Sequence, residues 1–169
     1  MKIYITGILT LIIYFPIFLF MIRGNFRKKF SKINSRGLDI LVEIMIGILY
    51  FLVILFSFFK PIVIGKISVL GILVYFAGLA LTYSGYYIFY KETGLITKNV
   101  YAISRNPTYF FGFVAIFGIV LMTLSWEIFV MLILLLVLTD RIVKNEEKFL
   151  KEKFGKKYLE YRERVRRWI

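Results

Sequence analysis

Five long apolar stretches run along this chain, with short polar segments between them. At about 1.5 Å of rise per residue, a helix of roughly 20 apolar residues crosses the hydrocarbon layer of a bilayer. The first three stretches reach that length, and the last two are shorter and are joined only by Ser125-Trp126. The pattern therefore predicts five transmembrane helices, at about residues 3–22, 38–59, 67–90, 109–124 and 127–143, the last two forming a tight hairpin.

The composition supports this interpretation. Of the 169 residues, 60% are hydrophobic, and the mean hydropathy is +0.78. Soluble domains are less apolar than this. Neither a linker nor a repeat divides the chain, so we expect an all-α integral membrane protein with a single membrane domain over residues 1–169. The first stretch is expected to be a retained anchor, because a basic loop follows it and a small-residue cleavage site does not.

The positive charges predict the orientation. Of the 23 Lys and Arg residues, all but Lys2, Lys60 and Lys66 lie in the loop 23–37, in the loop 91–108 or in the tail from Arg141 onward. Basic residues concentrate on the cytoplasmic side of membrane proteins. We therefore expect a multi-pass protein of the cell membrane with its N-terminus outside and its C-terminus in the cytoplasm. The net charge of +13 then indicates anionic lipid headgroups as partners, and no nucleic acid.

Two further sequence patterns, a glycine repeat and a polar tail, predict how the helices pack. Gly71, Gly78 and Gly85 recur every seven residues, and such a stripe lets another helix backbone come close. The tail, at about 144–169, is polar with scattered apolar anchors. We expect Gly155 to divide it into two amphipathic helices that lie against the cytoplasmic ends of the bundle.

The sequence contains no cysteine and no histidine. This excludes disulfides, thiolate nucleophiles and Ser-His-Asp triads, and we expect no metal site. Proton transfer is left to carboxylates, Tyr or Lys, whose usual pKa values lie far from neutrality.

The fourth helix begins with a signal that has two compatible interpretations. Asn106 suits an N-cap and Pro107 the first helical residue. The same helix start offers free backbone N–H groups, and Arg105 adds a guanidinium beside them, so the segment is also a candidate anion site.

Glu146 and Glu147 follow the fifth helix. On spacing alone they indicate a solvated helix face, with Glu147 and Lys151 as an ion pair. The charge distribution, however, places them on the same side as Arg105. A pair of carboxylates facing an anion site is complementary to a zwitterion such as S-adenosylmethionine. Asp39 and Glu43 share one face of the second helix; pairing with Arg36 explains them structurally, and Glu43 is a candidate acceptor-side residue.

These residues form a recognisable order. The stretch Tyr101–Gly112 (YAISRNPTYFFG) is followed, after one hydrophobic hairpin, by Asn145–Leu150 (NEEKFL) and Phe154–Tyr161 (FGKKYLEY). This order closely resembles the signature of the isoprenylcysteine carboxyl methyltransferase and phospholipid methyltransferase superfamily, over about residues 90–169. The first two helices carry no such signature. Asn106 replaces a histidine common in the isoprenylcysteine enzymes, and Asn99-Val100 replace a frequent Gly-Pro.

The resemblance implies an integral-membrane methyltransferase that binds S-adenosylmethionine between the last helices and the tail. A lipidic acceptor would enter from the bilayer. By position in the motifs, the implied catalytic residues are Arg105, Asn106 and Glu147. The implied cofactor-binding residues are Tyr101, Arg105, Asn106, Pro107, Tyr109, Glu146, Glu147, Tyr158 and Tyr161.

The acceptor is predicted from chemistry. A carboxylate is already ionised at pH 7, whereas an ammonium must first lose a proton. The lack of histidine therefore favours carboxyl methylation of an isoprenylcysteine-like substrate. N-methylation of a phospholipid headgroup is the alternative, with a buried glutamate as base. Two other classes stay open, a non-catalytic protein that binds membrane lipids and an NADPH-dependent membrane reductase.

Overall fold

The computed structural model describes residues 3–22, 37–92 and 94–169. The described part is helical, and its extended pairing is limited to a single bridge between Ile3 and Ile62. Most of the basic loop predicted at 23–37, including Arg36, lies outside the described residues. The helices are α1 (Thr6–Ile22), α3 (Gly37–Phe59), α4 (Lys66–Lys91), α5 (Val100–Ile103), α6 (Pro107–Thr123), α7 (Trp126–Phe154) and α8 (Lys156–Arg164).

Two of these helices are long and apolar enough to cross a membrane. They are α3 from Asp39 onward and the whole of α4. Residues Thr6–Phe15 of α1 and all of α6 form shorter apolar helices. Large apolar side chains on the outside of α3 and α4 are well exposed, with Phe51 at 62% and Leu73 at 65%. Such surfaces are unfavourable in water and suit contact with lipid.

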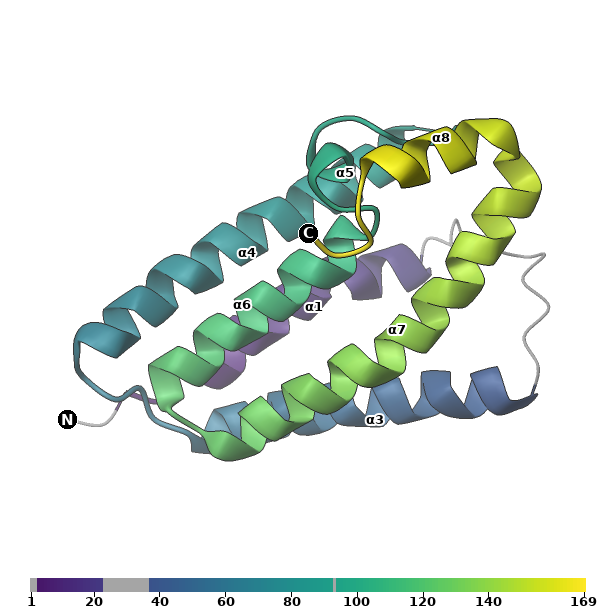
Figure 1. The fold of residues 1–169 in the computed structure, drawn as a ribbon. Helices are drawn as coiled ribbons and strands as arrows, with labels where there is room; N and C mark the ends of the chain where they lie inside the picture. Colours follow the sequence, from purple (N-terminus) through teal and green to yellow (C-terminus); the bar gives the residue numbers. More distant parts are fainter. Residues whose placement is uncertain (1–2, 23–36, 93) are drawn as a thin grey trace.

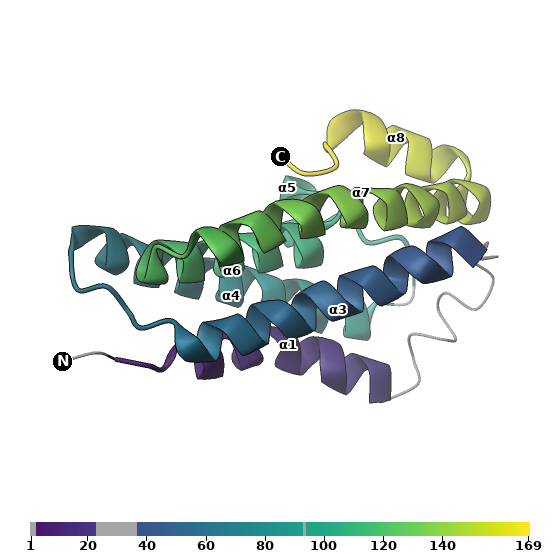
Figure 2. The ribbon, with the colours of Figure 1, turned by 90° about the horizontal axis from the view of Figure 1, so that it is seen from below.

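The long helices form a bundle with two distinct ends (Figures 1 and 2). α4 packs along α6, α3 packs along α7, and α1 contacts α3, α6 and α4. One end holds the connection from α3 to α4 and the turn from α6 to α7. The other end holds α5, α8 and the C-terminus. Residues far apart in sequence are thus gathered at that second end.

The contact between α4 and α6 depends on glycine. A Cβ atom on Gly78 would lie 2.6 Å from the backbone nitrogen of Ala115, and one on Gly118 would lie 2.6 Å from the backbone nitrogen of Tyr75. Both distances are too short for real atoms, so the two backbones touch directly at these positions. The close approach predicted from the glycine spacing is confirmed, and α6 is the partner helix.

The predicted hairpin between the fourth and fifth helices is also present. α6 ends at Thr123, and its C-cap residue Leu124 has a φ of 50°. The Ser125 hydroxyl accepts a hydrogen bond from the backbone of Ile128 as the N-cap of α7. Beside this turn, Lys60 and Glu127 form an ion pair with an N–O distance of 2.6 Å. The pair ties the α3–α4 connection to the start of α7.

One predicted boundary is wrong. The last long helix does not end at about residue 143 but continues to Phe154. Residues 144–154 contain neither glycine nor proline, so no backbone signal interrupts the helix there. Gly155, with a φ of 52°, is the break that was predicted, and α8 follows it. The short helix α5 lies within the segment expected to be a loop.

Gly118→Ala tests the α4–α6 contact. The added methyl group has to displace backbone, which we expect to lower the free energy of unfolding by about 2 kcal/mol. Gly112→Ala, on the same helix, is the control: nothing lies within 4 Å of its Cβ position, so the higher helix propensity of alanine should stabilise by up to ~1 kcal/mol. Thermal unfolding of the detergent-purified variants measures both, and equal melting temperatures would contradict the contact.

Candidate functional site

The start of α6 holds the predicted anion-site residues. Arg105 lies between α5 and α6, Asn106 occupies the N-cap position, and Pro107 is the first helical residue, as predicted. The Asn106 side chain, however, does not cap the helix. Its amide nitrogen donates to Glu147 Oε1 at 3.4 Å. Asn106 therefore links the start of α6 to α7 instead of closing its own helix.

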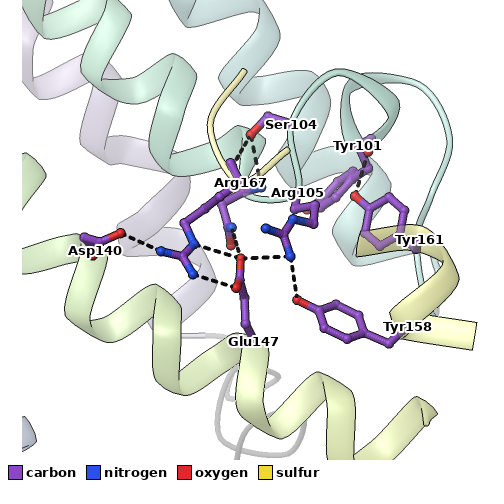
Figure 3. A network of polar contacts seen from close by, with 9 residues as sticks. Tyr101, Ser104, Arg105, Asp140, Glu147, Tyr158, Tyr161 and Arg167 are labelled. Atoms are coloured by element: carbon purple, nitrogen blue, oxygen red, sulfur yellow. Dashed lines mark hydrogen bonds and ion pairs between the residues drawn. The ribbon is translucent and has the colours of Figure 1, made fainter. Parts of the chain in front are cut away.

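Glu147 is the acidic centre of this end of the bundle (Figure 3). Its side chain is only 9% exposed. The carboxylate accepts two hydrogen bonds from Arg167, from Nε at 3.0 Å and from Nη2 at 2.9 Å, and it lies 3.5 Å from Arg105 Nη1. The interpretation from spacing alone, a solvated pair with Lys151, is wrong, because Arg167 and Arg105 are the partners of this carboxylate.

Arg167 was not identified from the sequence. Its Nη1 also donates to Asp140 at 2.9 Å, and the hydrogen bonds to Glu147 raise the pKa of its guanidinium above the usual value. In the sequence it is one of many basic tail residues, and only the neighbouring Trp168 marks it as different. The Trp168 ring lies 6.3 Å from that of Phe113, so the end of the chain packs against the bundle.

Two main-chain contacts fix the tail beside Arg105. The backbone N–H of Arg105 donates to the carbonyl of Arg166 at 3.0 Å, and the Ser104 hydroxyl donates to the carbonyl of Arg167 at 2.8 Å. The segment after α8 thus runs back across the start of α6 (Figure 3).

The Arg105 side chain is largely buried, and its polar contacts are long. Its side chain is 9% exposed, and its Nη1 reaches Tyr158 OH and Glu147 Oε1 only at 3.5 Å. Its Nε is buried and has no hydrogen-bond partner in the described part of the chain. A buried donor without a partner is costly, so this nitrogen is an unsatisfied donor where an anionic ligand would be stabilised.

An open pocket of about 70 Å³ adjoins Arg105. Two cations, Arg105 and Lys153, contribute to its wall, and the remaining lining is largely aromatic or aliphatic: Phe89, Gly94, Leu95, Ile96, Tyr101, Phe149, Leu150, Phe154 and Tyr161. Glu146, Glu147 and Tyr158 are not among these lining residues. Tyr101, Arg105 and Tyr161 therefore line the pocket, whereas Glu147 and Tyr158 contact Arg105 outside it.

The predicted tyrosines are brought together by α5 and α8. Tyr161 donates from its hydroxyl to the backbone carbonyl of Tyr101 at 2.6 Å, and Tyr158 is 1% exposed. The Tyr158 and Tyr161 rings lie 6.3 Å apart, edge to face. Burial raises the pKa of Tyr101 and of Tyr161, so both phenols stay neutral at physiological pH.

Glu146 points away from this cluster. It is partly buried and accepts a hydrogen bond from the Tyr109 hydroxyl at 2.8 Å. Burial raises the pKa of Glu146 to about 7; the charges of Glu147 and Glu43 act in the same direction, and the Tyr109 hydrogen bond opposes them. The two adjacent glutamates therefore belong to different local sites.

The carboxylates of α3 lie apart from the Arg105 cluster. Glu43 is exposed on that helix, and its negative charge contributes to the raised pKa of Glu146. Asp39 accepts from Arg141 Nε at 3.2 Å, an exposed contact. Among the described residues, no group of three or more His, Cys, Asp and Glu side chains is placed to hold a metal ion.

The comparisons with known proteins give one match. A family model described as phospholipid methyltransferase matches residues 42–157, from α3 to the start of α8. Neither the curated proteins nor the solved structures gave a match. The matched range is well over half of the chain and includes Arg105, Glu146 and Glu147. The resemblance seen in the sequence is confirmed, and the chain belongs to the phospholipid methyltransferase family of membrane methyltransferases.

Proposed function

We propose that this protein transfers a methyl group from S-adenosylmethionine to the amine headgroup of a membrane lipid. The observation that carries the proposal is the Arg105 guanidinium, which is buried, weakly paired and at the wall of an aromatic pocket. S-adenosylmethionine carries both an aromatic base, which suits the aromatic pocket, and a carboxylate, which suits the guanidinium. The family supplies the reaction class.

The residues present fit such a methyl donor. Arg105 would bind its carboxylate, supported by the backbone N–H groups at the start of α6 around Pro107. Tyr101 and Tyr161 line the pocket and would flank the adenine, and the buried Tyr158 holds Arg105 from behind. When bound, the donor supplies an electrophilic methyl group on a sulfonium, so the protein mainly has to position the acceptor and exclude water.

Asn106 and Glu147 would complete the donor site. Asn106 donates to Glu147 and so fixes one carboxylate oxygen. The other oxygen of Glu147, Oε2, accepts from Arg167 and retains a lone pair for a ribose hydroxyl or the amino group of the donor. In this assignment Glu147 and Arg105 are the residues on which donor binding depends.

Glu146 supports an amine as the acceptor. An ammonium headgroup has to lose a proton before it can be methylated, and a carboxyl group with a pKa of about 7, hydrogen-bonded to Tyr109, is suited to take that proton. Glu43, exposed on α3, would attract an ammonium approaching from the lipid. Two carboxylates would repel an acceptor carboxylate, which makes methylation of an isoprenylcysteine carboxyl group the second candidate.

The bundle fits a five-span topology with the site at the cytoplasmic face. The spans would be α1, α3, α4, α6 and residues 126–143 of α7. Lys60 and Lys66 lie at the end with the α6–α7 turn, whereas Arg105 and the basic helix α8 lie at the other (Figure 1). By the positive-inside rule the second end, with the C-terminus, is cytoplasmic and the N-terminus is outside. The basic face of α8 would contact anionic lipid headgroups, and residues 1–169 act as one domain.

The acceptor is identified by the chemistry of the product. Detergent-purified protein is incubated with methyl-labelled S-adenosylmethionine and either aminophospholipids or prenylcysteine analogues. We expect alkali-stable label in the aminophospholipids, as an N-methyl group requires. Alkali-labile label in the prenylcysteine analogues would instead indicate a methyl ester and overturn the amine assignment.

Arg105→Ala tests the donor site. Loss of a charged hydrogen-bonding partner costs about 1.5–3 kcal/mol, so we expect the dissociation constant for S-adenosylmethionine to rise roughly 10- to 100-fold. Arg164→Gln, which removes an exposed charge from α8, should leave it unchanged. Equilibrium binding of labelled donor measures both variants.

Thermal unfolding of the wild type separates the other function classes. Protection by NADPH, and not by S-adenosylmethionine, would favour a reductase, and protection by neither would favour a non-catalytic lipid-binding protein.

Glu146 predicts a pH dependence of stability. Because its pKa in the folded protein is about 7, against a usual 4.5, the folded state binds this proton more tightly than the unfolded state. The resulting stabilisation is complete below pH 4.5 and is lost as the pH rises through 7. For a partly buried group we expect a loss of about 2 kcal/mol.

Glu146→Gln should flatten this dependence between pH 5 and 8, as followed by thermal unfolding in detergent. Glu160→Gln, at an exposed position of α8, is the control and should keep the wild-type profile. A wild-type protein whose melting temperature does not fall over this range would contradict the environment assigned to Glu146.

A further inference from the structure

Two guanidinium groups compete for one carboxylate at the cytoplasmic end of the bundle. Figure 3 shows Arg167 and Arg105 on opposite sides of Glu147. Arg167 holds both carboxylate oxygens at 2.9 and 3.0 Å. Arg105 approaches only Oε1, at 3.5 Å. Glu147 is therefore committed to Arg167, and its contact with Arg105 is loose.

Arg167 has this advantage because its position is fixed in advance. The backbone carbonyls of Arg166 and Arg167 accept hydrogen bonds from Arg105 N–H and the Ser104 hydroxyl. Asp140 holds the third guanidinium nitrogen at 2.9 Å. A planar guanidinium that binds a carboxylate through two parallel hydrogen bonds forms one of the strongest polar pairs in proteins. The Arg167 side chain therefore loses little conformational entropy when it pairs with Glu147.

Without Arg167 the same carboxylate would have to find another cation. Glu147 is 9% exposed, and an unpaired charge at that depth is strongly destabilising. Arg105 is the cation already within 3.5 Å, and a small movement of its side chain would close a direct ion pair. Its guanidinium would then be neutralised by Glu147 and turned away from the pocket.

We propose that Arg167 is a positioning residue that engages Glu147 and thereby keeps Arg105 available to bind the carboxylate of the methyl donor. The inference rests on the proposed function, in which Arg105 makes that contact. It assigns a role to the last residues of the chain, which lie beyond the range matched by the family. Arg167 itself need not touch the donor.

The test compares two nucleotides that differ only in the group Arg105 is proposed to bind. S-adenosylmethionine carries the carboxylate, and decarboxylated S-adenosylmethionine lacks it. For the wild type we expect at least tenfold tighter binding of the former. In Arg167→Gln we expect this preference to fall to about twofold or less, with the affinity for the decarboxylated nucleotide nearly unchanged. A role of the tail in folding alone would weaken both nucleotides equally.

Two further variants isolate the competition. The double variant Arg167→Gln/Glu147→Gln removes the carboxylate that captures Arg105, so the preference should return towards the wild-type ratio. Arg166→Gln removes a neighbouring charge whose side chain is exposed, and it should keep the ratio. Arg167→Lys retains the charge but loses the two parallel hydrogen bonds, so its ratio should be intermediate; it also serves if Arg167→Gln does not fold.

Failure of the proposed function and failure of the positioning role would give different results. A wild type that binds both nucleotides equally would overturn the proposed contact of Arg105, and this inference with it. A wild type that prefers S-adenosylmethionine, together with arginine-167 variants that keep the preference or weaken both nucleotides equally, would overturn the positioning role alone.

Discussion

The end of the bundle that holds α5, α8 and the C-terminus depends on the charge balance of one buried carboxylate, Glu147. Burying an ion is favourable only if partners replace its hydration, and the partners here come from three places: Asn106 at the start of α6, Arg105 before it, and Arg167 at the end of the chain. That requirement joins α6, α7 and the tail, which are far apart in sequence. Arg105 also lines the neighbouring pocket, whose wall is otherwise formed by the end of α4, residues 94–96, α5, α7 and α8.

Two adjacent glutamates serve this arrangement because a helix turns by about 100° per residue. Glu147 faces the tail and its arginines, whereas Glu146 faces Tyr109. In the first environment two guanidinium groups lie against the carboxylate. The second raises the pKa of the carboxyl group to about 7 by burial. Under the proposed function, one short acidic motif would therefore support both the binding of a charged donor and the removal of a proton from an acceptor, without histidine.

Local signals in the sequence were sufficient for much of the fold. The apolar stretches predicted the long helices, the glycine spacing predicted the contact now seen between α4 and α6, and the motif order predicted the family. Contacts between distant segments were not predictable in the same way. Arg167 resembles the other basic tail residues until the chain folds back on Ser104. Likewise, the Asn106 side chain makes no cap hydrogen bond and instead donates to Glu147, a partner 41 residues away that local sequence does not indicate.

The glycine contact and the ion pairs also divide the site into parts of different rigidity. α6 is held against α4 backbone to backbone, and the contact extends to the start of α6, where the Thr108 methyl carbon would lie 2.9 Å from a Cβ on Gly85. Arg105 thus extends from a fixed base. The opposite wall, α8 with the last residues, is attached mainly through polar contacts and the Trp168 ring. Under the proposed function the donor would lie beside Arg105, so its binding would depend on how Glu147 divides its ion pairs between Arg105 and Arg167.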